Sequence, residues 1–133
     1  MTEEEKAKLK ILILDDDKFL LNMYSNKFKN AGFDIETIAN TELALEKIRD
    51  GFKPDVLLLD IIMPKMSGLE LVEKIKEEKL LPNATYVMLT NQSESADIDR
   101  AKKLKVHGYI VKATTIPSEV VEEVTKIIES RRK

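Results

Sequence analysis

The run Val56-Leu57-Leu58-Leu59-Asp60 decides the fold, because four consecutive apolar residues end abruptly in a carboxylate. A short run that is apolar at every position is typical of a strand buried on both faces of a parallel sheet. Residues 11–14 repeat this pattern and end in Asp15, and residues 86–89 repeat it and end in Thr90. We therefore expect three central strands, each followed by a polar side chain.

Two weaker apolar runs, residues 35–38 and 109–111, are shorter or more mixed and suit the edges of a sheet. A helical stretch follows each of the five runs; the fourth, at about 94–104, is polar and charged, and the last has Pro117 in its first turn and apolar residues at helical spacing. Parallel strands need such crossovers. The sequence therefore predicts an α/β fold, a doubly wound five-stranded parallel sheet in the order 2-1-3-4-5 with five helices.

The composition narrows the class of protein. A chain of 133 residues is the size of one domain, 1–133, with residues 1–9 expected to be a solvated tail. Twenty-two basic and 24 acidic residues argue against direct binding of nucleic acid through bulk charge. The absence of cysteine excludes disulfides, thiolate zinc sites and thiol catalysis. No apolar run is long enough for a membrane span and no signal peptide is evident, so we expect a cytoplasmic protein.

Polar side chains stand where four of the five predicted strands end. Asp15 and Asp16 follow the first run, Asp60 the third, Thr90 the fourth and Lys112 the fifth. The carboxyl ends of the strands in a doubly wound sheet share one rim, with a crevice where the winding reverses. The sequence therefore predicts a site at this rim.

The residue types of this site indicate its chemistry. A cluster of carboxylates without His or Cys selects a hard cation, and Mg²⁺ fits because it takes few carboxylates and keeps positions for a phosphoryl oxygen. The ammonium of Lys112 and the hydroxyl of Thr90 suit the oxygens of a transferring phosphoryl group. A carboxylate can also attack phosphorus. We expect Asp60 to be both a metal ligand and this nucleophile.

Four motifs carry a resemblance to a known family: ILILDDD at 11–17, LLLDIIMPKMSGLEL at 57–71, VMLTN at 87–91 and GYIVKA at 108–113. In this order and spacing they resemble the receiver domain of bacterial two-component response regulators, the CheY-like domain with a flavodoxin-like fold. The resemblance covers essentially the whole chain, from about Lys10 to Ile128.

The resemblance implies a phosphoprotein of a phosphorelay and a role for each matching residue. Asp60 would accept a phosphoryl group from the phosphohistidine of a sensor histidine kinase or a phosphotransfer protein. Asp15 and Asp16 would hold Mg²⁺, with the backbone carbonyl of Ile62 as the remaining protein ligand. Lys112 would pair with the phosphoryl group.

The resemblance also implies a conformational switch. The hydroxyl of Thr90 would move toward the phosphoryl group and Tyr109 would then swing inward. This movement would change the surface formed by the fourth helix, the fifth strand and the last helix, which in this family usually meets the output partner. A homodimer through these two helices, with the output protein unidentified, is a further expectation.

The sequence departs from the family pattern after the lysine, where Ala113 replaces a proline that usually follows a cis bond. A cis bond before a non-proline costs about 3 kcal/mol, so the Lys112–Ala113 bond is either trans or strained. Ile62 and Gln92 occupy the variable positions that flank the site. We expect apolar Ile62 to obstruct attacking water and to slow self-dephosphorylation.

The sequence favours a signalling phosphoacceptor that is not an enzyme in its own right, and two other functions are alternatives. A Mg²⁺-dependent aspartyl-phosphate phosphohydrolase would need a second Asp at position 62 and room for a cap insertion. A receiver-like interaction module would not need the acceptor set. Asp17 is expected in the first turn of a helix and His107 in a solvated loop. The basic residues are either a solvated face or a docking patch; they are Arg100, Lys102, Lys103 and Lys105.

Overall fold

A computed structural model describes residues 1–132 of the protein, and its secondary structure follows the predicted alternation. The strands are β1 (Lys10–Leu14), β2 (Asp34–Ile38), β3 (Val56–Leu59), β4 (Thr85–Thr90) and β5 (Gly108–Val111). The helices are α1 (Glu3–Ala7), α2 (Lys18–Asn30), α3 (Thr41–Arg49), α4 (Gly68–Glu77), α5 (Ser95–Lys103) and α6 (Pro117–Arg131), with a 3₁₀ turn η1 (Lys112–Thr114). The five predicted helices are α2 to α6, and α1 is additional.

The five strands form one parallel sheet in the order β2-β1-β3-β4-β5, as predicted. The register pairs Leu14 of β1 with Leu59 of β3, so the residues that follow these two strands come to the same rim. Every residue of β3 and β4 is buried, whereas the edge strand β2 is mostly exposed or half-buried. Complete burial on both faces explains why the central strands are uniformly apolar.

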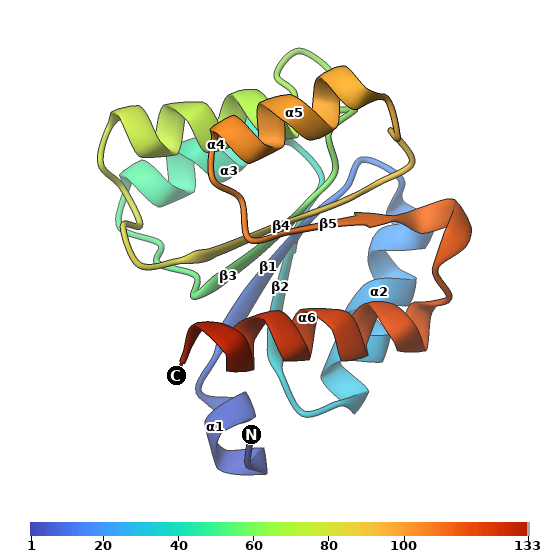
Figure 1. Ribbon diagram of the computed structural model, residues 1–133. Helices are drawn as coiled ribbons and strands as arrows, with labels where there is room; N and C mark the ends of the chain where they lie inside the picture. Colours follow the sequence, from blue (N-terminus) through green and yellow to red (C-terminus); the bar gives the residue numbers. More distant parts are fainter. Residues whose placement is uncertain (133) are drawn as a thin grey trace.

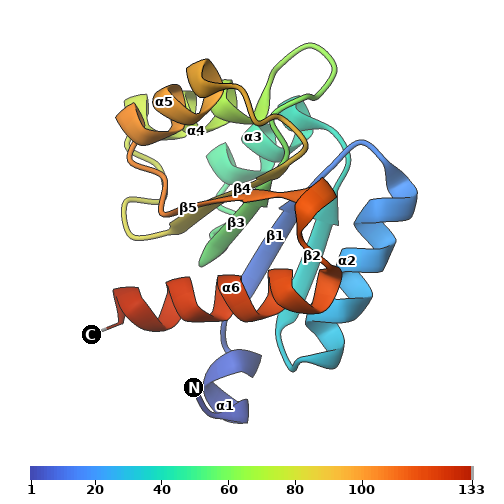
Figure 2. The same ribbon diagram turned by 45° about the vertical axis from the view of Figure 1, so that its right-hand side comes forward.

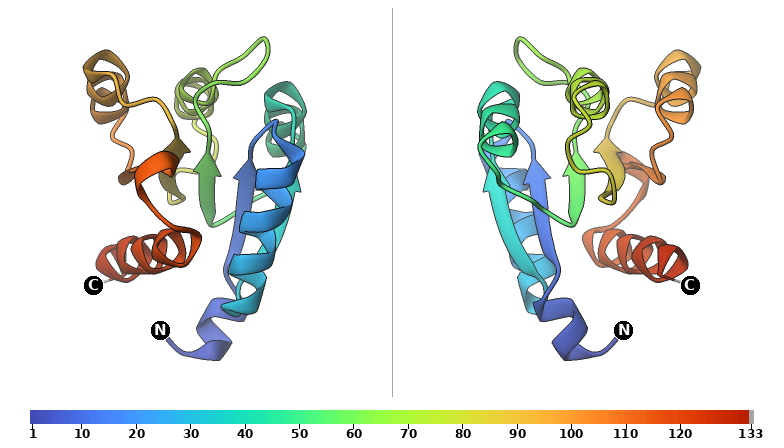
Figure 3. Two further views of the ribbon diagram at one scale, coloured as in Figure 1. Left: turned by 90° about the vertical axis from the view of Figure 1, so that its right-hand side faces the viewer. Right: turned by 90° about the vertical axis from the view of Figure 1, so that its left-hand side faces the viewer.

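Helices cover both faces of the sheet (Figure 1; Figure 3 shows the layers end-on). Helices α3, α4 and α5 lie on one face, where Leu57 and Leu59 point, and α2 and α6 lie on the other, where Val56 and Leu58 point. Alternate residues of each central strand therefore supply two separate apolar cores. This arrangement leaves the carboxyl ends of the strands uncovered.

Residues 1–9 differ from the solvated tail expected from the sequence. No residue of α1 is buried, but the amino group of Met1 contacts the carboxylate of Glu129 at 2.9 Å, and Arg132 contacts Glu5 at 2.7 Å. Leu9 packs against the core beneath α2 and α6. The two ends of the described chain consequently lie side by side (Figures 1 and 2).

Gly68 lets the loop after β3 turn back tightly over the rim. A Cβ atom at this position would lie 1.9 Å from the backbone oxygen of Asp60, which no side chain can tolerate. The backbone N–H of Gly68 also donates to the carbonyl of Ile61 at 3.0 Å. A glycine is therefore required here for close approach, and it fixes the segment that carries Asp60.

Candidate phosphoacceptor site

Three charged residues of the predicted site meet at the carboxyl end of the sheet. The ammonium of Lys112 donates to Asp15 Oδ2 at 2.5 Å and to Asp60 Oδ2 at 2.9 Å. These side chains are almost entirely buried, with exposed fractions of 7% for Lys112, 4% for Asp15 and 12% for Asp60. Lys112 therefore bridges the ends of β1 and β3 from the end of β5.

Asp16 completes the acidic cluster from the solvent side. One carboxylate oxygen from each of Asp15, Asp16 and Asp60 lies within 4.8 Å of the others, and Asp16 is exposed. At this distance each pair of charges repels by about 3.5 kcal/mol at an effective dielectric of 20. One lysine balances only one of three carboxylates, so this all-oxygen donor set fits a hard divalent cation.

The environment acts on the two most buried charged groups in different ways. Burial raises the pKa of Asp15 above its ordinary value, although hydrogen bonds from Lys112 and from the Asp17 backbone oppose this shift. Burial opposes the charge on Lys112, but its hydrogen bonds to Asp15 and Asp60 outweigh burial and raise the pKa of Lys112. Lys112 therefore stays positively charged, whereas burial disfavours the charged form of the Asp15 carboxylate beside it.

Thr90 and Tyr109 are connected through one residue of the loop after β4. Buried Thr90 accepts a hydrogen bond at Oγ1 from the backbone N–H of Gln92 at 3.2 Å. The Tyr109 hydroxyl donates to the backbone carbonyl of the same Gln92 at 2.5 Å. A movement of this loop would therefore affect both side chains.

One cavity of about 330 Å³ is lined by Asp15, Asp16, Asp60, Thr90 and Lys112, whereas Tyr109 is not among its lining residues. Ile62 and Gln92 also line it, and Ile62 is 60% exposed at its mouth. The bond between Lys112 and Ala113 is trans, which decides the alternative that the sequence left open.

Leu20 and Asn91 also line the cavity and were not identified from the sequence. Tyr24 was missed as well, although the charges of Lys112, Asp15 and Asp60 influence its hydroxyl. The only sequence signal was the spacing of Leu20 and Tyr24, which lie one helical turn apart on α2, four and eight residues after Asp16.

Two residues outside the charge cluster have structural roles. Asp17 is the N-cap of α2, accepting from the backbone N–H groups of Phe19 and Leu20, in agreement with its expected place at a helix start. His107 is not simply a solvated loop residue: it is half-buried, and its ring contacts Tyr86 and Arg131. Contacts to residues 21 and 24 positions away depend on tertiary packing and leave no local signal.

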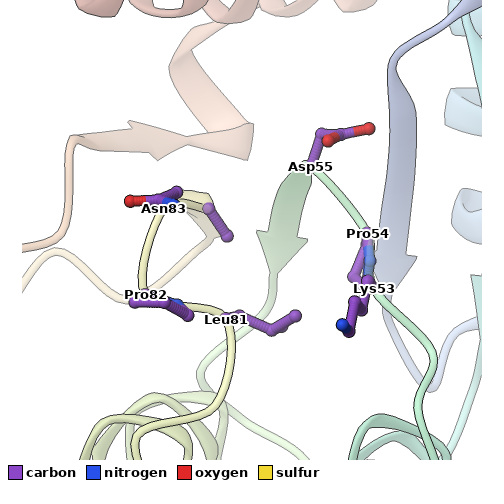
Figure 4. Close-up of a pocket in the computed structure, with 7 residues that line it drawn as sticks. Lys53, Pro54, Asp55, Leu81, Pro82 and Asn83 are labelled. Carbon is purple, nitrogen blue, oxygen red and sulfur yellow. The ribbon is translucent and has the colours of Figure 1, made fainter.

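A second hollow of about 320 Å³ lies at the opposite end of the sheet (Figure 4). Its lining comes from the loops that precede β3 and β4 and includes Lys53, Asp55 and Pro82. The carboxylate of Asp55 already accepts from the backbone N–H of Lys10 at 2.9 Å. This hollow contains none of the predicted site residues, so the candidate chemistry belongs to the other rim.

The fold and the acidic rim are those of a receiver-type signalling domain, and comparison with known proteins agrees. Residues 11–125 match the response regulator receiver domain family, and the chain belongs to this family. It is a CheY-like receiver of two-component signalling, a signalling phosphoacceptor rather than an enzyme in its own right, with an acidic pocket of Asp15, Asp16 and Asp60 beside Lys112.

Individual relatives differ in length. The chain is 33% identical to the chemotaxis protein CheY of Thermotoga maritima over 119 residues, covering 89% of this chain and 96% of that protein. It is 30% identical to the alkaline phosphatase synthesis transcriptional regulatory protein PhoP of Bacillus subtilis, covering 90% of this chain but 48% of the relative. The chain thus spans about half the length of some curated relatives.

Solved structures show the same fold. A CheY-like response regulator receiver domain protein from Methanospirillum hungatei JF-1 superposes with a TM-score of 0.83 at 26% identity, covering 93% of this chain and 96% of that one. The chemotaxis protein CheY4 of Vibrio cholerae gives a TM-score of 0.80 at 26% identity, covering 90% and 98%. Within residues 1–132, no helix combines the length and apolarity that crossing a membrane requires.

Proposed function

We propose that Asp60 is the residue that receives the phosphoryl group. The observation that carries this proposal is the contact between Asp60 Oδ2 and Lys112 Nζ at 2.9 Å, in a cavity that the other two carboxylates share. A carboxylate oxygen of Asp60 would attack the phosphorus of a phosphohistidine. The phosphorus–nitrogen bond would break, its electron pair would stay on the imidazole, and an acyl phosphate would form.

Mg²⁺ is the proposed cofactor. Asp15, Asp16, Asp60 and the backbone carbonyl of Ile62 would hold it, and the mutual repulsion of the three carboxylates together with the burial of Asp15 supports this assignment. The bound ion would supply positive charge to the phosphoryl oxygens. Lys112 would supply a second, fixed positive charge, exchanging its contact with Asp60 for a phosphoryl oxygen.

Thr90 and Tyr109 are the proposed switch residues. Once a phosphoryl group occupies Asp60, the Thr90 hydroxyl would turn toward it and leave the Gln92 backbone N–H. Because Tyr109 holds the carbonyl of the same Gln92, the loop would carry the change to the surface of α5, β5 and α6. That surface is the proposed contact for the output partner, and a homodimer through α5 and α6 is part of the same proposal.

The lifetime of the acyl phosphate is the property that Ile62 would control. Its side chain is apolar, 60% exposed and lines the mouth of the cavity. Water attacking phosphorus in line would pass this side chain, and Ile62 offers it no hydrogen bond. The proposal is therefore slow self-dephosphorylation.

The cellular setting follows from these assignments. The phosphoryl donor would be a sensor histidine kinase or a phosphotransfer protein, and the compartment the cytoplasm. We treat residues 1–133 as a single receiver domain, of which residue 133 lies outside the described residues. Among relatives, the Mycobacterium leprae protein is called the DNA-binding response regulator MtrA, whereas this domain would have no direct contact with nucleic acid.

Acetyl phosphate tests the proposal without a kinase. Incubation with acetyl phosphate and Mg²⁺, followed by intact mass measurement, should show the gain of one phosphoryl group, and Asp60→Asn or chelation of Mg²⁺ should abolish it. Asp50→Asn is the matched control, because it makes the same change at an exposed residue at the end of α3 that does not line the cavity, and this variant should be phosphorylated normally. Failure of the unmodified chain with both acetyl phosphate and a kinase would favour an interaction module.

A further inference from the structure

His107 faces two hydrogen-bond donors, although a neutral imidazole can accept only one hydrogen bond. The backbone N–H of Tyr86 donates to His107 Nδ1 at 3.0 Å, and Arg131 Nη1 approaches His107 Nε2 at 2.5 Å. Tyr86 is buried, so its N–H needs this acceptor. Nδ1 must therefore carry the lone pair, and the proton of the neutral ring lies on Nε2.

This tautomer leaves two donors, the N–H of His107 Nε2 and the guanidinium of Arg131, directed at each other without an acceptor between them. Further contacts keep both groups in this region. Arg131 also donates to Thr85 Oγ1 at 2.9 Å and to the carbonyls of Asn83 and Ala84 at 3.2 and 3.3 Å. The backbone N–H of His107 donates to the Tyr86 carbonyl at 2.8 Å.

An open cavity of about 360 Å³ adjoins this pair, between the beginning of β5 and the carboxyl-terminal half of α6, whose relative positions are visible in Figures 1 and 2. It is lined by His107, Lys126, Ile127, Ser130 and Arg131. Of these described residues none is acidic, and every polar one can donate a hydrogen bond. Gly108 leaves room for the Ile127 side chain here, because a Cβ at position 108 would lie 2.4 Å from Ile127 Cδ1, which would have to turn away.

The surrounding charge is also positive. Lys76 of α4 acts electrostatically on His107, and Lys105 and Arg131 act in turn on Lys76. Burial, followed by the charges of Arg131 and Lys76, lowers the pKa of His107 and keeps its ring neutral near pH 7. Arg131 of α6 and Lys76 of α4 therefore both place positive charge near the His107 ring, where two donors need an acceptor.

We propose that this cavity binds a tetrahedral oxyanion, such as phosphate or a phosphate ester, which accepts hydrogen bonds from His107 Nε2, Arg131, Lys126 and Ser130. A single anion would satisfy both opposed donors and offset the converging positive charge. A carboxylate has the same accepting chemistry but only two oxygens, so it binds more weakly. The site lies at the end of the sheet opposite Asp60 and does not depend on the phosphorylation proposed there.

The chain has one histidine, so the ¹⁵N and ¹³C resonances of its imidazole can be followed without ambiguity. The Asp60→Asn variant, without Mg²⁺, would be titrated with inorganic phosphate, with acetate and with chloride at equal ionic strength. We expect a proton on Nε2 at the start, a saturable shift of that resonance with phosphate, a weaker one with acetate and none with chloride.

Removal of one cation should weaken phosphate binding at least about tenfold, since a hydrogen bond to a charged group is worth about 1.5–3 kcal/mol. Arg131→Gln tests this directly, and exposed Lys126→Gln tests it if the loss of the Arg131 contacts impairs folding. Lys29→Gln on α2 makes the same change of charge and should leave binding unaltered. The proposal is overturned if the shift is linear, if chloride produces it equally, if the proton lies on Nδ1, or if Lys126→Gln leaves the affinity unchanged.

Discussion

Replacing Lys112 with methionine should destabilise the Mg²⁺-free protein by about 3 kcal/mol at pH 7, because loss of one partner of a buried ion pair costs about 3–5 kcal/mol. The structure supports this magnitude. Lys112 makes the two contacts of 2.5 and 2.9 Å to Asp15 and Asp60, and the three carboxylates it faces lie within 4.8 Å of one another. Each pair of those carboxylates repels by about 3.5 kcal/mol at an effective dielectric of 20.

Urea unfolding followed by far-ultraviolet circular dichroism measures this loss. The loss of stability should shrink with saturating Mg²⁺, which supplies the missing positive charge. It should also shrink at acid pH, where the Asp15 carboxylate, whose pKa is raised by burial, becomes protonated. Lys29→Met is the matched control, since it removes an exposed lysine of α2 and should cost less than about 0.5 kcal/mol. A loss below about 1 kcal/mol for Lys112→Met, or an equal loss with and without Mg²⁺, would refute the reasoning.

Three further changes test other parts of the site and fold. Asp15→Asn should raise the free energy of unfolding without Mg²⁺, because burial disfavours the Asp15 carboxylate. The same variant should lower Mg²⁺ affinity in a calorimetric titration, and an unchanged affinity would be inconsistent with Asp15 as a metal ligand. Ile62→Asn should shorten the half-life of the acyl phosphate in a mass-resolved decay, and an unchanged half-life would exclude Ile62 as the obstacle to water. The pKa of His107 is lower in the folded protein than the ordinary value of 6.5, so the unfolded chain binds more protons as the pH drops below 6.5. The free energy of unfolding should therefore fall as the pH drops from 6.5 through the folded pKa. His107→Gln should flatten this part of the pH profile, and a slope identical to that of the unmodified protein would contradict the prediction.

The sequence predicts the sheet well because burial leaves a strong local pattern. Residues 56–59 are apolar at every position, and all four are buried in β3. The same pattern in β1 and β4 places Asp15 and Thr90 at the rim, because a parallel sheet brings all carboxyl ends together. The site is thus predicted by topology, with little need for detail of the side chains.

Features that depend on distant packing were missed. The five residues of α1 are too few for a helical pattern to be recognised, and the contacts that hold this end of the chain reach Glu129 and Arg132, more than 120 residues away. The opposed donors at His107 likewise need α6 to lie against β5 before Arg131 can reach the ring. The trans bond between Lys112 and Ala113 leaves no signal in the sequence and is seen only in the three-dimensional structure.

Locating the phosphoryl group within the chain tests the central claim most directly. The protein would be treated with acetyl phosphate and Mg²⁺, reduced with borohydride, which converts an aspartyl phosphate to homoserine, and digested for peptide mass spectrometry. The account predicts homoserine at position 60, with none when Mg²⁺ is chelated. Homoserine at Asp15 or Asp16 instead, or a phosphoryl group on a hydroxyl side chain with position 60 unmodified, would contradict it.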